Sequence, residues 1–166
     1  MANRQKEYDK GAKGWLLFVE NGTLKFRYSP SNQFNKPTYE PASDEQKTIE
    51  GGNLNMGEWA HVAVTEKRDG SIRLYVNGIL TGEGERYRRE HTLNNSTYLS
   101  LFADAFEYAP IEAAVDELKI WNYELNEEEI RREMYSVNTD NRDGLVAYYA
   151  FNGDNLSTDN GCNISW

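Results

Sequence analysis

Apolar and polar residues alternate in the central stretch 57–82, and this alternation predicts three consecutive antiparallel strands. Apolar side chains occupy every second position in the runs 60–64 and 72–76, which is the period of a strand with one buried face. Turn residues follow each run, at 68–70 and at Asn77-Gly78. Because glycine adopts the positive φ that tight hairpins need, these turns predict a meander.

Pairing across the first turn can also be predicted from side-chain parity. If Val64 faces Leu74 and Val62 faces Val76, the loop between the two runs must contain an odd number of residues. The segment 68–70 satisfies this condition, as a hairpin loop with glycine in the left-handed region. A shift by one residue would turn the apolar set away from the core.

Further strands are predicted on both sides of this meander. They lie at 15–20, 23–28, 47–50, 97–102, 114–121 and 144–151. The first two flank an Asn-Gly pair and should form a hairpin. The polar residues 1–13 indicate a loop or a frayed start, and 29–45 and 103–111 indicate surface loops, which often carry binding residues.

A single short helix is predicted after Asn126. This residue can cap the helix, and the three glutamates 127–129 place negative charge at its positive end. Ile130 and Met134 form an i, i+4 apolar pair, and the helix should end by Tyr135. Many strands at short spacing with one helix indicate an all-β, two-sheet antiparallel sandwich.

Four motifs in this pattern resemble those of one known family. They are Trp59-Ala60-His61-Val62-Ala63-Val64-Thr65, Leu74-Tyr75-Val76-Asn77-Gly78, the segment 115–122, and Leu125 with Glu129-Ile130. In this order they resemble the bacterial laminin G-like, concanavalin A-like lectin and glucanase jelly-roll domains, over roughly residues 15–134. The resemblance implies a jelly roll of two curved sheets. Family members are usually non-catalytic recognition modules, found on secreted and cell-surface proteins and beside glycan-degrading enzymes.

One segment departs from the family order. Family domains usually begin with a strand that resembles 144–154, and here this segment comes last. The chain is then a fragment, or its end begins a following repeat, or the segment 143–166 completes the same sandwich as its last strand and tail. We favour a fragment whose last strand docks into the sheet, because this strand would otherwise be an aggregation-prone edge. A second copy could also supply missing strands, which would give a homo-oligomer.

Length and charge narrow the function classes. The 166 residues suit a single domain, 1–166, and the net charge of −9 disfavours nucleic acid as a partner. The basic cluster 86–89 is short and is flanked by glutamates. No segment approaches the roughly 20 apolar residues of a membrane span. Cys162 is the only cysteine, so an internal disulfide is excluded.

The sequence offers little for catalysis. Glycosidases of similar fold carry two glutamates that flank an aspartate on one strand, and residues 112–117 lack that spacing. Asp116 and Glu117 are adjacent, so on a strand they would point to opposite faces. His61 and His91 have no metal-ligand partner at short spacing. We therefore predict that the protein is not an enzyme.

A structural calcium ion is the cofactor to consider, since many jelly-roll modules hold one. Calcium binds several loop oxygens, and Asp154 lies in an oxygen-rich turn with Asn152, Asp159 and Asn160. Asp116 is the next candidate ligand. The alternative, which the spacing favours, is that these are ordinary turn residues and that Asp116 ties down neighbouring loops.

Glycan recognition needs an aromatic platform together with amide or carboxylate groups. Tyr39 from the proline-rich loop and Asp104, Phe106 and Tyr108 from the loop 103–111 offer that chemistry. The alternative is local packing of these aromatic residues. The tryptophans predicted to lie in the core are Trp15, Trp59 and Trp121.

Three functions follow from these observations. The first is a non-catalytic carbohydrate-binding or adhesive module of an extracellular or cell-surface protein, with a glycan or a protein as its ligand. The second is a protein-interaction or structural module of a larger assembly, without a glycan site. The third is a glycoside hydrolase of the same fold.

Overall fold

A computed structural model describes residues 2–6, 12–29, 47–67, 70–85, 99, 101, 113–137 and 143–152. The strands of this part of the chain are β1 (Ala2–Lys6), β2 (Ala12–Glu20), β3 (Thr23–Ser29), β4 (Lys47–Asn53), β5 (Val62–Glu66), β6 (Ser71–Val76), β7 (Ile79–Glu85), β8 (Leu118–Trp121) and β9 (Leu145–Tyr149). The helix α1 (Glu127–Met134) lies between the last two strands in sequence. These elements confirm the all-β class with a short helix.

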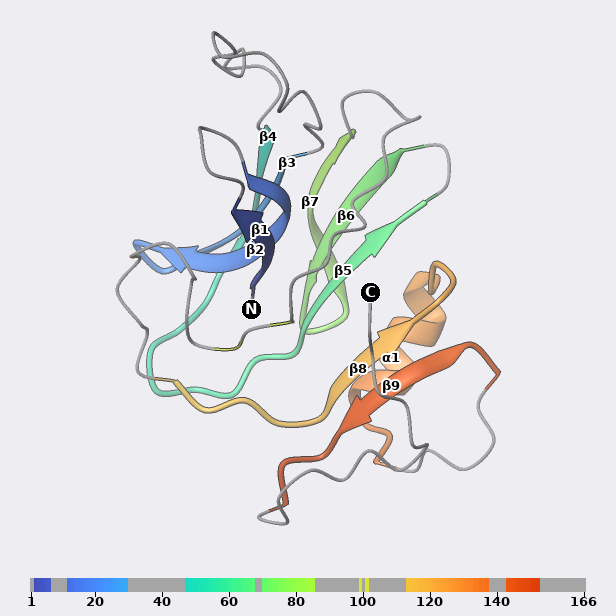
Figure 1. Ribbon diagram of the computed structural model, residues 1–166. Coiled ribbons are helices and arrows are strands. Elements are labelled where there is room, and N and C mark those ends of the chain that lie inside the picture. Colours follow the sequence, from blue (N-terminus) through green and yellow to red (C-terminus); the bar gives the residue numbers. More distant parts are fainter. Residues whose placement is uncertain are drawn as a thin grey trace, which may run out of the picture.

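Two antiparallel sheets pack face to face and form the sandwich (Figure 1). One has the order β1-β2-β3-β4 and the other β5-β6-β7. The core between them consists of Leu24, Phe26, Tyr28, Ile49, Ile72, Leu74 and Val76. Because these residues alternate along their strands, each sheet presents one apolar face to the other.

The meander has the predicted register. Val62 pairs with Val76, and Val64 pairs with Leu74. Gly70 closes the first turn with a φ of 94°, and Asn77 and Gly78 form the second with φ values of 53° and 72°. Both turns therefore use positive φ, as the hairpin chemistry requires.

The N-terminal residues differ from the expected loop. β1 forms at Ala2–Lys6 and pairs with β2, from Ala2 opposite Leu16 to Lys6 opposite Ala12. This strand carries no apolar alternation. Main-chain hydrogen bonds to a neighbouring strand can support such a segment whatever its side chains, which explains why the pattern missed it.

The two sheets approach closely where their edge strands β4 and β7 meet. A Cβ atom added to Gly82 would lie 2.2 Å from the carbonyl oxygen of Glu50, and one added to Gly84 would lie 2.7 Å from Ile49. Only glycine permits the backbone contact at Gly82, whereas the contact at Gly84 is with the Ile49 side chain. Along this edge, glycines therefore close the sandwich.

β8 and β9 form a separate antiparallel pair, with Lys119 opposite Tyr148 and Ile120 opposite Ala147. Among the described residues, the last strand therefore pairs with β8 and does not join either sheet of the sandwich, although the sequence predicted that it would dock there. β8 is shorter than the expected 114–121, because Glu117 has a φ of 54° that interrupts the extended chain. Of the expected strand 97–102, the structure describes only Leu99 and Leu101, and neither is in a strand.

The helix α1 begins and ends as predicted. The Asn126 side chain accepts a hydrogen bond from the Glu129 N–H at 2.9 Å, and the Glu129 carboxylate accepts one from the Asn126 N–H at 2.8 Å. This reciprocal pair is a capping box. Ile130 is buried in a second apolar cluster with Tyr75 and Leu125, so the helix is fixed against the outer face of the meander.

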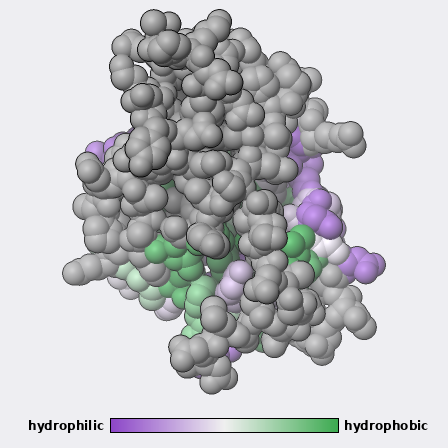
Figure 2. All heavy atoms as spheres, viewed as in Figure 1, coloured by the Kyte–Doolittle hydropathy of each residue, from purple (hydrophilic) through white to green (hydrophobic). Residues whose placement is uncertain are grey.

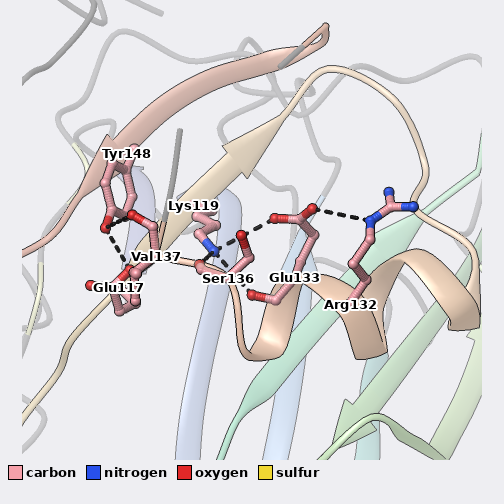
Figure 3. A network of polar contacts seen from close by, with 7 residues as sticks. All are labelled: Glu117, Lys119, Arg132, Glu133, Ser136, Val137 and Tyr148. Carbon is pink, nitrogen blue, oxygen red and sulfur yellow. Dashed lines mark hydrogen bonds and ion pairs between the residues drawn. The ribbon is translucent and has the colours of Figure 1, made fainter. Parts of the chain in front are cut away.

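A polar network joins α1 to β8 and β9 (Figure 3). The Lys119 ammonium donates to the carbonyl oxygens of Glu133, at 3.0 Å, and of Ser136, and lies 3.6 Å from the Glu133 carboxylate. The Tyr148 hydroxyl donates to the Glu117 carboxylate at 2.5 Å. The polar side chains at this contact are therefore paired rather than left exposed.

Burial of the tryptophans agrees only in part with the expectation. Trp15 stacks on Phe26 with ring centroids 6.2 Å apart, and Trp121 packs beside the helix cluster, so both are partly buried. Trp59 was expected in the core, but 72% of its surface is exposed. It precedes β5 in an irregular segment, where strand alternation does not direct the side chain inward.

Hydrophobic residues also reach the surface elsewhere. In the space-filling view, green hydrophobic residues show in the lower half of the molecule (Figure 2). Large apolar side chains that are exposed include Met56, Ile79, Tyr135 and Val137. In the described part of the chain, no helix is long and apolar enough to cross a membrane.

Candidate functional site

A groove of about 430 Å³ lies between the meander and the start of α1. Its walls are Arg73, Tyr75, Leu80 and Glu83 from β6 and β7, and Glu124, Asn126 and Glu127 around the helix start. On β6 the core residues Ile72 and Leu74 point inward, so the alternation turns Arg73 and Tyr75 to the opposite face. The segment before α1 then covers part of that face.

Arg73 is held at the centre of an ion-pair network. Its Nε donates to the Glu83 carboxylate at 2.9 Å, and its Nη1 donates to the Glu124 carboxylate at 3.3 Å. Arg73 and Glu83 are directly opposite each other on β6 and β7. The hydrogen bond to Glu83 is the main cause that raises the pKa of Arg73 above its ordinary value. The guanidinium is therefore charged and fixed in position.

Tyr75 provides a polar group that has no hydrogen-bond partner among the described residues. Only 2% of its surface is exposed, because its ring packs with Ile130 and Leu125. Within the described part of the chain its hydroxyl makes no hydrogen bond, and this oxygen is not among the enclosed polar atoms that lack a partner, so it is open to the groove. A buried tyrosine usually finds a partner for this group. The hydroxyl borders the groove, so a ligand there can supply the missing partner.

The remaining walls combine apolar and acidic groups. Leu80 lies opposite Tyr75 across a register shift between β6 and β7, which brings it to the groove. Glu127 accepts a hydrogen bond from Arg131 Nη2 at 3.1 Å, one helical turn away. Asn126 is occupied by the helix cap. The groove thus offers a hydroxyl with no partner among the described residues, a fixed cation, several acceptors and an apolar side chain.

Such a groove suits a small polar ligand. Ligand sites in proteins occupy roughly 300–1,000 Å³, and this groove falls within that range. Carboxylates and a guanidinium that are already fixed can exchange hydrogen bonds with hydroxyl groups without further ordering. The arrangement is therefore chemically able to bind a polyhydroxylated molecule.

Comparison with known families shows to which family the chain belongs. A family model described as the concanavalin A-like lectin/glucanases superfamily matches residues 8–131, which is more than half of the 166 residues. The chain belongs to this superfamily. The predicted resemblance is therefore confirmed, and the groove lies on this superfamily's sandwich.

One solved structure is similar to this superfamily member. It is an S-layer domain-containing protein, residues 221-444, from Clostridium thermocellum ATCC 27405, with 23% sequence identity and a TM-score of 0.36. The similarity covers 67% of this chain and 51% of that chain. This chain thus spans about half the length of the solved one. No curated protein sequence matches.

Most of the predicted site residues lie outside the described residues of this superfamily member. These are Tyr39, Asp104, Phe106, Tyr108 and Asp154. Asp116 is described and exposed, and its carboxylate accepts a hydrogen bond from the N–H of the adjacent Glu117 at 2.9 Å. Among the described residues, no three His, Cys, Asp or Glu side chains are grouped so that they could hold a metal ion. Structural calcium stays a prediction.

His61 occupies a partly buried position. Its N–H donates to the Asn77 side chain at 2.9 Å, and the Asn77 N–H donates to the His61 carbonyl oxygen at 2.8 Å. Its Nδ1 is enclosed and has no hydrogen-bond partner. Burial, together with the charge of Lys119, lowers the pKa of His61 below 6.5.

Sequence reasoning did not identify the groove residues. The meander pattern places Arg73 and Tyr75 on the face away from the core, and Glu83 follows on the next strand. That arrangement could have predicted a group of polar side chains on the outer face of the meander. The cover by residues 124–127 was not predictable, because it depends on where α1 docks.

Proposed function

We propose that this superfamily domain is a non-catalytic carbohydrate-binding module of a secreted or cell-surface protein, and that its groove binds the sugar. The observation that carries this proposal is Tyr75, a buried side chain that borders a ligand-sized groove and whose hydroxyl has no hydrogen-bond partner among the described residues. Sugar hydroxyls are both donors and acceptors. They can therefore pair with this hydroxyl and with the carboxylates of Glu83 and Glu124 at the same time.

The fixed ion pairs support binding rather than catalysis. Glu83 and Glu124 contact the same guanidinium, so both are engaged as acceptors. Paired-carboxylate hydrolysis instead uses one carboxyl group as a proton donor and the other as a base or nucleophile. The hydrolase stays an alternative, and release of sugar from a polysaccharide panel would establish it.

The experiment compares the wild-type chain with Tyr75→Phe, which removes only the hydroxyl oxygen. A glycan array selects a binder, and calorimetric titration then measures its dissociation constant. We expect Tyr75→Phe to weaken binding about threefold to tenfold, the value of one net hydrogen bond. Tyr135→Phe is the matched control, because Tyr135 is exposed and does not line the groove.

Two results would overturn the proposal. One is that the wild-type chain binds no glycan at millimolar concentration. The other is that Tyr75→Phe binds as tightly as the wild type while the groove ligand is the same. A urea titration of each variant verifies that the fold is intact before binding is compared.

A second candidate function is a protein-interaction module, and exposed apolar residues favour it. Met56 is 92% exposed and Trp59 is 72% exposed, both in the segment between β4 and β5. Residues of this type are enriched where proteins contact one another. Self-association, which the sequence also suggested, is one form of this function. Sedimentation of the wild-type chain and of Trp59→Ala over a range of concentrations tests self-association. If both proteins are monomers, self-association is contradicted.

A further inference from the structure

The walls of the groove carry an excess of negative charge. Among the described residues that line the groove, Glu83, Glu124 and Glu127 face one cation, Arg73. Arg73 already pairs with two of these carboxylates, so its charge is neutralised within the wall. A ligand that enters the groove meets a net negative field from the remaining acidic charge.

The described groups next to the groove reduce this field without reversing it. Arg131 pairs with Glu127 at 3.1 Å, but both side chains are about half exposed and such helix pairs are weak. The N-terminus of α1 contributes a positive partial charge of about half an elementary charge. The first turn carries Glu127, Glu128 and Glu129 against it. The field therefore stays negative at the helix start.

We infer that the groove selects sugars by charge, so that an amine-bearing sugar binds more tightly than its neutral analogue and an acidic sugar is excluded. This inference rests on the proposed function of the same groove. Tyr75 supports the presence of a ligand independently of charge, because this buried side chain lines the groove and its hydroxyl has no hydrogen-bond partner in the part of the chain that the structure describes. An ammonium group adds donors that match the carboxylate acceptors.

The test uses three oligosaccharides of identical linkage and length. They are a glucosamine oligomer, the corresponding glucose oligomer and the corresponding glucuronic acid oligomer. At low ionic strength we expect the glucosamine oligomer to bind about threefold to tenfold more tightly than the glucose oligomer. The glucuronic acid oligomer should not bind measurably. Added salt should reduce the preference, because the carboxylates are partly exposed.

Two charge variants locate the effect. Glu127→Gln removes one wall carboxylate and should lower the ratio of the two affinities about twofold to threefold. Glu128→Gln removes the same charge from the same helical turn, but this residue does not line the groove. We expect Glu128→Gln to leave the ratio unchanged within error.

The outcomes separate this inference from the proposed function. If the glucose oligomer binds and the glucosamine oligomer binds no more tightly, the charge selection is wrong and the carbohydrate function stands. Equal effects of Glu127→Gln and Glu128→Gln would also overturn it, because the preference would then follow overall charge. If none of the oligomers or array glycans binds, the proposed function fails and this inference fails with it.

Discussion

Two interfaces in the described part of the chain differ in chemistry. The interface between the two sheets is apolar, with Leu24, Ile72 and Leu74 fully buried. The interface between α1 and the pair β8-β9 contains Lys119 and Glu133, whose side chains are only 8% and 7% exposed. Both interfaces exclude water, but only the second depends on the matching of buried charges.

This difference changes how each interface responds to substitution. An apolar core loses stability in proportion to the volume removed. A buried ion pair adds little net stability when intact, because desolvation offsets the attraction, but it becomes costly when only one partner is removed. Single and double substitutions should therefore separate the two interfaces.

The largest effect is expected at Lys119. Lys119→Met leaves the Glu133 carboxylate buried without its ammonium partner, and we expect the free energy of unfolding to fall by about 4 kcal/mol. Urea denaturation measures this change.

The matched double variant sharpens this test. Lys119→Met together with Glu133→Leu replaces both charges by apolar groups, and it should recover part of the loss. The rest should persist, because the carbonyl oxygens of Glu133 and Ser136 lose their Lys119 donor in both variants. Equal instability in the single and double variants would show that the ion pair is not responsible. Arg132→Met is the control, because Arg132 is mostly exposed although it lies 3.6 Å from the same carboxylate.

In the apolar core between the two sheets, we expect a single substitution to lower the stability through lost packing alone. Leu74 is completely buried, and Leu74→Ala should lower the free energy of unfolding by about 3 kcal/mol through lost contacts and a residual cavity. Leu80→Ala is the comparison, because this leucine is exposed on the neighbouring strand. A loss at Leu74 no larger than at Leu80 would contradict the assignment of the core.

The same contrast explains what the sequence could predict. The register of Val62, Val64 and Leu74 followed from alternation and turn chemistry, because both are local properties of the chain. The Lys119–Glu133 pair joins a strand to a helix, and nothing in the local pattern marks these charges as buried. For the same reason the groove was missed, since Glu124 and Glu127 reach Arg73 and Tyr75 only after α1 has docked. The predicted loop residues Tyr39, Asp104, Phe106 and Tyr108 stay predictions, as do Asp154 and the role of Asp116 in calcium binding.

Docking of α1 also depends on its own start. Asn126→Ala removes the side-chain half of the capping box, and it should lower the free energy of unfolding by about 1 kcal/mol. Asn126→Asp keeps an acceptor and should retain most of the stability. If Asn126→Ala has no effect on urea denaturation, the packing of Ile130 alone fixes the helix.

The smallest effect expected is the pH dependence from His61, which lies close enough to Lys119 to be influenced by its charge. Because burial and Lys119 lower the pKa of His61 below 6.5 in the folded protein, the unfolded chain binds more protons between the lowered pKa and 6.5. The free energy of unfolding is therefore unaffected by this group above about pH 6.5, and it falls as the pH drops below that value.

His61→Phe removes the titrating group, so the free energy of unfolding should change less with pH between about pH 7 and about pH 5. Most carboxyl groups have ordinary pKa values below this range. Lys119→Met with Glu133→Leu offers the sharper measurement, because without the ammonium charge His61 should protonate at a higher pH. The slope of stability against pH should then decrease but not vanish, since burial is the first cause of the shift. An unchanged slope in His61→Phe would assign the pH dependence to other groups.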